Sequence, residues 1–186
     1  MAATTTDVFP SLSTGRLTLR AVTPDDGAPF RALLSIAEVT RYSDWPDAPA
    51  EDQADQFVRN MAALFPAGTG CAWIIEDSAS AEFIGAIRFN YFIKPWKCGG
   101  IGYETHPRFW GRGVMTEALR AAVACGRRLF GLNRIEAWTL PGNGASDRVL
   151  EKTGFRFEGT LRQRAWFKGA FHDLRFFGRV ADDPTD

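Results

Sequence analysis

The feature that most constrains this chain is a glycine-rich turn between an expected strand and an expected helix. The strand covers residues 101–105, the helix covers residues 116–130, and the run W-G-R-G-V-M lies between them. Two glycines allow a sharp turn and a close approach of the backbone to a ligand. Because the first N–H groups of a helix lack partners inside it, such a turn suits a pyrophosphate. The alternative is an ordinary tight turn. The motif G-x-x-x-x-G-K-[ST] is absent, which argues against a nucleoside-triphosphate loop.

Hydrophobic patterns on both sides of this turn predict one α+β domain. Alternating patterns predict strands at residues 16–22, 71–76, 83–93, 134–140, 155–161 and 171–180. Helical patterns predict further helices at residues 23–35, 51–65 and 147–153. This order favours a mixed sheet with helices on both faces. The first strand has no glycine-rich turn after it, which argues against a dinucleotide-binding sheet.

Length and charge limit the domain organisation and the partners. A chain of 186 residues fits one domain, expected here over residues 16–180. A flexible arm is expected at residues 1–15 and a disordered acidic tail at residues 181–186. Lys and Arg together number 22, as do Asp and Glu, so the net charge is zero and binding to nucleic acid is not expected. No stretch approaches the roughly 20 apolar residues of a membrane span.

The cysteines and histidines indicate the compartment and argue against a metal site. Cys71, Cys98 and Cys125 fit neither a disulfide framework nor a C-x-x-C metal site. They are therefore predicted to be reduced thiols of a cytoplasmic protein, and the N-terminus has none of the features of a signal peptide. Since His106 and His172 are the only histidines, no structural zinc site is expected.

The run around the turn resembles the coenzyme A loop of the GNAT acetyltransferases, specifically that of their RimJ/RimL-type branch. The family pattern Q/R-x-x-G-x-G/A falls on residues 110–115, with Trp110 in place of Gln/Arg and Met115 in place of the last Gly/Ala. The family's later elements N-x-x-S, E-K-x-G-F and E-G are matched by residues 143–146, 149–155 and 158–159. The resemblance extends over residues 16–180.

The resemblance implies the GNAT fold and a coenzyme site. The sheet would be mostly antiparallel, with a central pair of parallel strands, residues 101–105 and 134–140, that splay apart. Acetyl-CoA is the implied cosubstrate, with its pantetheine arm lying between these strands, and no metal is implied. The implied coenzyme-binding residues are Tyr103, Thr105, Arg112, Gly113, Val114, Met115, Thr116 and Asn143.

The implied reaction is direct transfer of an acetyl group to a primary amine, and three residues are its candidates. Ser146 matches the hydroxyl that reaches the sulfur in this branch; its alternative role is the N-cap of the helix at residues 147–153. Glu104 is the preferred base for the incoming ammonium, and its alternative is pairing with an arginine. Asp173 is the rival base, with a salt bridge as its alternative.

The acceptor and the oligomeric state stay open. The implied acceptor is an amine, either the N-terminus of a protein or a small molecule such as a polyamine, an amino acid or an aminoglycoside. A non-catalytic acyl-CoA-binding module is the alternative from another class of function. Four aromatic residues are candidates for lining the acceptor pocket, with core packing as their alternative: Trp45, Phe89, Tyr91 and Trp166. The chain is expected to be a monomer or a homodimer.

Overall fold

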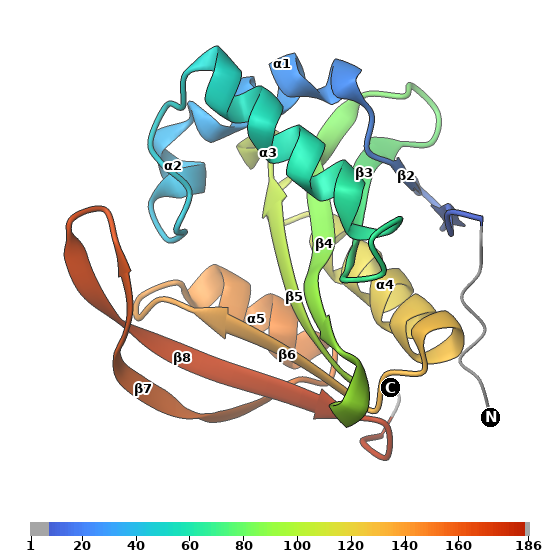
Figure 1. The fold of residues 1–186 in the computed structure, drawn as a ribbon, viewed down its shortest axis with the longest axis vertical. Helices are drawn as coiled ribbons and strands as arrows, with labels where there is room; N and C mark the ends of the chain where they lie inside the picture. Colours follow the sequence, from blue (N-terminus) through green and yellow to red (C-terminus); the bar gives the residue numbers. More distant parts are fainter. Residues whose placement is uncertain (1–7, 185–186) are drawn as a thin grey trace.

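An eight-stranded sheet with helices on both faces forms the centre of the molecule (Figure 1). The computed structural model describes residues 8–184. The strand order is β1-β2-β3-β4-β5-β6-β8-β7, and the neighbouring strands are antiparallel except for the pair β5 and β6. The expected mixed sheet, mostly antiparallel with one central parallel pair, is therefore confirmed.

Most of the expected elements are present, but several ends differ. The strand expected at residues 155–161 continues to Phe167, six residues further, and the helix expected at residues 23–35 is a 3-10 turn, Pro24–Asp26, followed by an α-helix. The strands are β1 (Leu12–Ser13), β2 (Leu17–Ala21), β3 (Cys71–Asp77), β4 (Phe83–Ile93), β5 (Cys98–Thr105), β6 (Arg134–Thr139), β7 (Arg156–Phe167) and β8 (Ala170–Val180). The helices of the described residues are α1 (Gly27–Leu34), α2 (Ala37–Thr40), α3 (Glu51–Leu64), α4 (Val114–Phe130) and α5 (Gly144–Lys152). Within this part of the chain no helix has the length and apolar character needed to cross a membrane.

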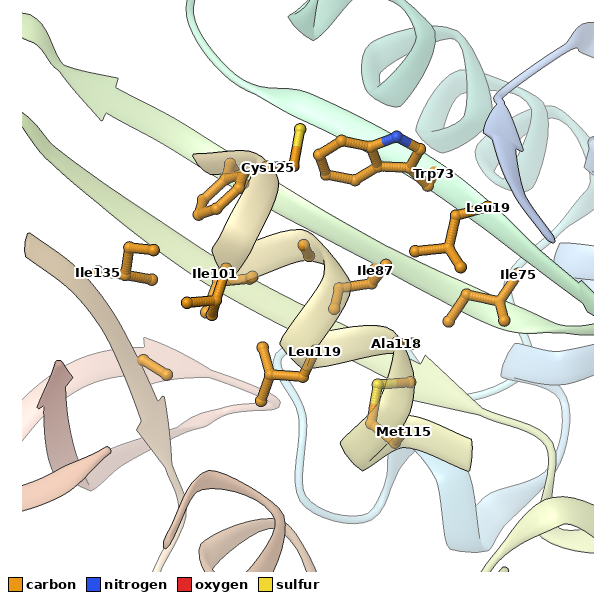
Figure 2. Close-up of a cluster of buried hydrophobic side chains, with 14 of the residues drawn as sticks. Leu19, Trp73, Ile75, Ile87, Ile101, Met115, Ala118, Leu119, Cys125 and Ile135 are labelled. Atoms are coloured by element: carbon orange, nitrogen blue, oxygen red, sulfur yellow. The ribbon is translucent and has the colours of Figure 1, made fainter. Parts of the chain in front are cut away.

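Two hydrophobic clusters hold the helices against the sheet. On one face, α4 lays its apolar side on the central strands, where Met115 and Leu119 join Ile87 of β4 in one buried cluster (Figure 2). A Cβ atom at Gly126 of α4 would come within 2.6 Å of the Phe89 ring, so only glycine permits this close approach. On the other face, α1 and α3 pack on β3 and β4 through residues such as Phe30, Leu34, Val58, Ile74 and Ala86.

The parallel pair β5 and β6 is hydrogen-bonded only at its start. Residues Cys98–Gly100 pair with Arg134–Glu136, and beyond this point β5 continues beside β4 while β6 continues beside β8. Figure 1 shows the two strands diverging. The N–H of His106 donates to the carbonyl of Ile84 in the β4 direction. By alternation, the backbone groups of Tyr103 and Thr105 therefore point into the gap between the splayed strands.

The N-terminal segment differs from the expected loose arm. Leu12–Ser13 forms the short strand β1 against β2, and the buried indole N–H of Trp73 donates to the carbonyl of Pro10 at 2.7 Å. Packing of Phe9 against Phe65 and Trp73 adds apolar contact that the polar composition of this segment does not reveal. The first part of the expected arm, residues 1–7, and the end of the expected tail, residues 185–186, lie outside the described residues.

Candidate active site

The glycine-rich turn has the geometry that its sequence predicts. Gly111 and Gly113 have φ values of +72° and +73°, and Gly113 is the N-cap of α4. The first hydrogen bond across the cap runs from the N–H of Glu117 to the carbonyl of Gly113, so the N–H groups of residues 114–116 have no partner inside the helix. A Cβ atom at Gly111 would meet nothing within 4 Å. The turn therefore offers an open cradle of backbone N–H groups.

The residues of this turn that were proposed to bind the coenzyme can contact it only through their backbone groups or through an exposed side chain. Val114 and Met115 bury their side chains in the core, and helix α4 begins at Val114, two residues earlier than expected. Arg112 is exposed and can reach an anion with its side chain. This set of groups fits a pyrophosphate, because backbone N–H donors, the positive end of a helix and a flexible arginine all favour negative charge.

An arginine that the sequence analysis did not single out supports the turn from outside. Arg16 donates to both the carbonyl of Arg112 and the carboxylate of Glu117, and Thr14 donates to the same carboxylate at 2.5 Å. Burial opposes the charged form of Glu117, but the hydrogen bonds from Thr14 and Arg16 outweigh it and lower the pKa of this carboxyl. The segment before β2 thus fixes the first turn of α4.

A cavity of about 540 Å³ opens where β5 and β6 splay apart. Four of the residues proposed for coenzyme binding or catalysis line it, namely Tyr103, Glu104, Asn143 and Ser146. The lining comes from both faces of the sheet, since Phe57 belongs to α3 and Leu150 to α5. A ligand that enters from the α3 side can therefore reach a group held on the α5 side through the gap in the sheet.

The hydroxyl of Ser146 is held by the side chain of Tyr103. The two hydroxyl oxygens lie 2.8 Å apart, and burial raises the pKa of Tyr103, so its phenol stays protonated near neutral pH. When the phenol donates to Ser146, the serine proton is left to point into the cavity. Helix α5 begins at Gly144, and its N-cap is Asn143, whose Oδ1 accepts from the N–H of Ser146 at 3.3 Å. The alternative role of Ser146 as the helix cap is therefore wrong.

Replacing Asn143 by alanine is expected to lower the free energy of unfolding by about 1 kcal/mol, because the first turn of α5 loses its side-chain cap. Chemical denaturation of the two proteins measures this difference. Asn143→Asp, which keeps an acceptor oxygen at the cap, should retain most of the stability. Equal stability of Asn143→Ala and the wild type would contradict the capping role.

The carboxylate of Glu104 is fully engaged with its neighbours. Arg88 donates to both of its oxygens, at 2.5 and 2.9 Å, and the indole N–H of Trp45 donates to Oε1 at 2.6 Å. The Arg88 guanidinium also lies 5.0 Å from the centre of the Trp45 ring. The structure thus has the arginine pairing that was the alternative for Glu104, and charge-assisted hydrogen bonds occupy both oxygens of this carboxylate.

Comparison with known proteins decides the family. The acetyltransferase (GNAT) domain family matches residues 16–156. The chain belongs to the GNAT acetyltransferases. It is 36% identical over 173 residues to the uncharacterized N-acetyltransferase YoaA of Bacillus subtilis, covering 93% of this chain and 98% of that one. It is 28% identical to the ribosomal-protein-serine acetyltransferase of Escherichia coli, over 74% of this chain and 76% of that one.

Solved structures agree on the fold of this acetyltransferase. RimL, a ribosomal L7/L12 alpha-N-protein acetyltransferase, in complex with coenzyme A, superposes with a TM-score of 0.84. The two sequences are 24% identical, and the match covers 93% of this chain and 99% of that chain. RimJ of Mycobacterium smegmatis with a CoA-disulfide gives a TM-score of 0.80 at 24% identity, over 89% and 82% of the two chains. The resemblance to the RimJ/RimL-type branch and the expected enzyme class, an N-acetyltransferase, are confirmed.

Asp173 lies outside the cavity lining of the acetyltransferase. Its carboxylate accepts from the N–H of Gln163 at 2.7 Å, across the β7–β8 hairpin. Gln163 has a φ of +49° and sits in a bulge of β7, so this bond stabilises an unusual backbone conformation. Neither the salt bridge that was its alternative role nor a contact with Glu104 or Ser146 is found for Asp173 among the described residues. Its role as the rival base stays a prediction without geometric support.

The other residues proposed from the sequence also lie partly at the cavity and partly away from it. Trp45 and Tyr91 line the cavity, whereas Phe89 is fully buried in the core beneath α4 and Trp166 lies exposed on the β7–β8 hairpin. The carbonyl of Thr105 accepts from the indole N–H of Trp110 at 2.8 Å, which leaves its N–H as the group free to face the gap. Within residues 8–184 no group of three His, Cys, Asp or Glu side chains converges to hold a metal ion.

Proposed function

We propose that this acetyltransferase moves the acetyl group of acetyl-CoA directly to the N-terminal amine of a protein. The observation that carries the proposal is the position of Ser146, on the wall of the cavity where the splayed strands and α5 meet. Bound acetyl-CoA would supply an activated thioester. The backbone groups of Tyr103 and Thr105, the N–H groups of residues 114–116 and the Arg112 side chain would hold it, and Asn143 would contribute its amide.

The protein's own groups account for the proton movements of this reaction. The Ser146 hydroxyl, supported by Tyr103, can give its proton toward the leaving sulfur. The Arg88–Glu104 pair and Trp45 form a rigid wall that orients the acceptor without exchanging protons. Glu104 therefore acts as a positioning residue in this proposal, in place of the base expected from the sequence.

A protein N-terminus fits the cavity better than a polycation does. Apart from Arg88, Glu104 and Asp44, the lining is aromatic, small or neutral, with Tyr42, Trp45, Phe57, Tyr91, Tyr103 and Trp138 as its large rings. Such a surface binds a peptide backbone and one ammonium group but offers few partners for several positive charges. The similarity to relatives named as acetyltransferases of ribosomal proteins supports the same choice. The described cysteines are free and buried, which fits the proposed cytoplasmic location.

Release of free thiol from acetyl-CoA, measured with a panel of amines, tests the proposed function. The panel contains a peptide with a free N-terminal alanine, a peptide with N-terminal serine, lysine, spermidine and an aminoglycoside. We expect thiol release with the peptides, and mass spectrometry should place the acetyl group on their N-terminus. Release with spermidine or the aminoglycoside alone would overturn the choice of acceptor. Absence of release with every amine would overturn the transfer itself.

Replacing Gly113 by aspartate is expected to raise the dissociation constant of acetyl-CoA at least about tenfold. A side chain at a φ of +73° strains the turn, and a carboxylate beside the pyrophosphate repels it. Isothermal calorimetry measures the binding. Gly169→Asp is the matched control, because Gly169 has a φ of +74° and open space around it in the distant β7–β8 turn. Unchanged affinity in a folded Gly113→Asp variant would contradict the coenzyme site.

A further inference from the structure

Asp44 places a carboxylate without a cation partner at the edge of the catalytic cavity. It belongs to the loop between α2 and α3 and lines the same cavity as Glu104 and Ser146. Among the described residues, no side chain donates a hydrogen bond to Asp44 and no cation lies within salt-bridge distance of it. The next residue, Trp45, is anchored by its bond to Glu104 and by edge contacts to Phe30 and Phe57. The loop that carries Asp44 is therefore fixed above the gap in the sheet.

The charges around the cavity leave one negative charge unbalanced. Arg88 is the cationic side chain among the described residues that line the cavity. Both of its terminal nitrogens donate hydrogen bonds to Glu104. Lys168, from the turn between β7 and β8, acts on Asp44 only through space, because its ammonium bonds to Asp47 and to the carbonyl of Thr40. Asp44 therefore remains the carboxylate that an incoming cation can pair with.

The surroundings of Asp44 also tune its affinity for a proton. Although the Asp44 residue is exposed, the surrounding protein removes part of the hydration of its carboxyl and so raises its pKa, and the nearby charge of Glu104 acts in the same direction. The positive charges of Arg88 and Lys168 oppose this shift without cancelling it. A carboxylate with a raised pKa takes a proton more readily than an ordinary aspartate does, which is the property that a general base needs.

We propose that Asp44 binds the ammonium group of the acceptor and takes the proton that must leave before the amine can attack. This inference rests on the proposed function and names a group that would contact the substrate itself. The acceptor loses one proton to Asp44, and the lone pair so released forms the N–C bond to the acetyl carbon of the thioester. The C–S bond breaks, and the electron pair goes to sulfur. The nitrogen loses a second proton as the sulfur gains one, and Asp44 returns its own proton to solvent at the open edge of the cavity.

The single unbalanced charge also sets the acceptor class. One carboxylate pairs with one ammonium, and the aromatic rings Trp45 and Phe57 beside it are suited to the uncharged remainder of the ligand. The inference therefore predicts that the free amine is the feature that the cavity recognises. An acceptor whose amine is already acetylated should bind weakly, because it brings no charge to Asp44.

Binding of two peptides tests this inference without depending on turnover. The probes are a neutral hexapeptide with a free N-terminal alanine and the same peptide with an acetylated N-terminus, titrated into the full chain in the presence of coenzyme A. We expect the wild type to prefer the free amine by at least about tenfold, and Asp44→Asn to lose most of this preference. Glu38→Gln is the matched control, since it removes one negative charge from an exposed position of α2 outside the cavity.

Turnover as a function of pH separates a base from a structural role. At pH 7 we expect Asp44→Asn to lower kcat/KM for the free peptide at least about tenfold, and the deficit should shrink above about pH 9, where the α-amine is mostly uncharged. The dissociation constant of acetyl-CoA should not change. A deficit that is the same at every pH, or a preference for the free amine that survives in Asp44→Asn, would overturn the inference. If the wild type prefers the free amine, Asp44→Asn loses this preference and no thiol is released, the proposed function fails and the binding role of Asp44 stands.

Discussion

Replacing Ser146 by alanine is expected to lower kcat by about 100-fold or more, while the dissociation constant of acetyl-CoA stays close to that of the wild type. The reason is that the leaving sulfur would lose the hydroxyl that can protonate it, whereas the groups that hold the coenzyme remain in place. Stopped-flow or steady-state release of free thiol measures kcat, and calorimetry measures the affinity. The thermal stability should change little, because Asn143 and not Ser146 caps α5.

Two further variants separate the proton donor from its support. Tyr103→Phe removes the phenol that lies 2.8 Å from the serine hydroxyl but keeps the ring in the same place. It should lower kcat less than Ser146→Ala does, since the serine proton remains but loses its fixed direction. Ser146→Thr, which keeps a hydroxyl, should recover part of the loss. A Ser146→Ala variant with normal turnover would show that the leaving sulfur takes its proton from water.

The fold could be predicted largely from the sequence because its elements carry strong local patterns. Helix α4 follows two glycines and repeats its apolar residues at helical spacing, and β6 alternates buried and half-buried residues along its length. The short elements were missed for physical reasons. Strand β1 has two residues and depends on pairing with β2, and α2 has four residues, so neither is long enough to have a period of its own.

The candidate site could be predicted in its backbone but less well in its side chains. The glycines of the turn and the register of the splayed strands follow from local sequence and the family resemblance. The environment of Glu104 depends on contacts between distant segments. Arg88 lies opposite Gly102 in the β4–β5 ladder, so Glu104 is its diagonal neighbour on the same face. The absence of a side chain at Gly102 leaves room for the guanidinium, and Trp45 reaches the pair from a loop.

Long-range contacts also explain why the sequence did not indicate Asp44 and why Asp173 lies outside the cavity lining. Asp44 lies in a loop rich in proline and aspartate, where nothing in the local pattern distinguishes it from Asp47, and both side chains are exposed. Its place in the cavity depends on the anchoring of Trp45 between two helices and the sheet. Asp173 was proposed as the rival base, but the bulge of β7 engages its carboxylate within the hairpin. Charged residues thus need the tertiary structure before their roles can be assigned.

Breaking the Arg88–Glu104 pair from one side is expected to lower the free energy of unfolding by about 3 kcal/mol or more. The side chains are only 10% and 6% exposed, and two hydrogen bonds join them. Arg88→Met leaves a carboxylate buried without its cation, and Glu104→Gln leaves a guanidinium without its anion. For a chain of this size the loss corresponds to a fall in Tm of about 6–12 °C. Urea denaturation and thermal scans measure the two quantities.

The double variant Arg88→Met with Glu104→Gln is expected to regain most of the lost stability, because neither residual charge remains in the wall. Arg31→Met is the control, since the Arg31–Glu51 pair is exposed and its loss should lower stability by less than about 1 kcal/mol. The double variant also decides the role of Glu104 in catalysis. If Glu104 only positions Trp45 and Arg88, the double variant, with its stability regained, should keep its turnover within about tenfold of the wild type at every pH. If Glu104 is the base, the double variant should be stable yet inactive at pH 7, and its activity should return as the acceptor amine loses its proton at higher pH.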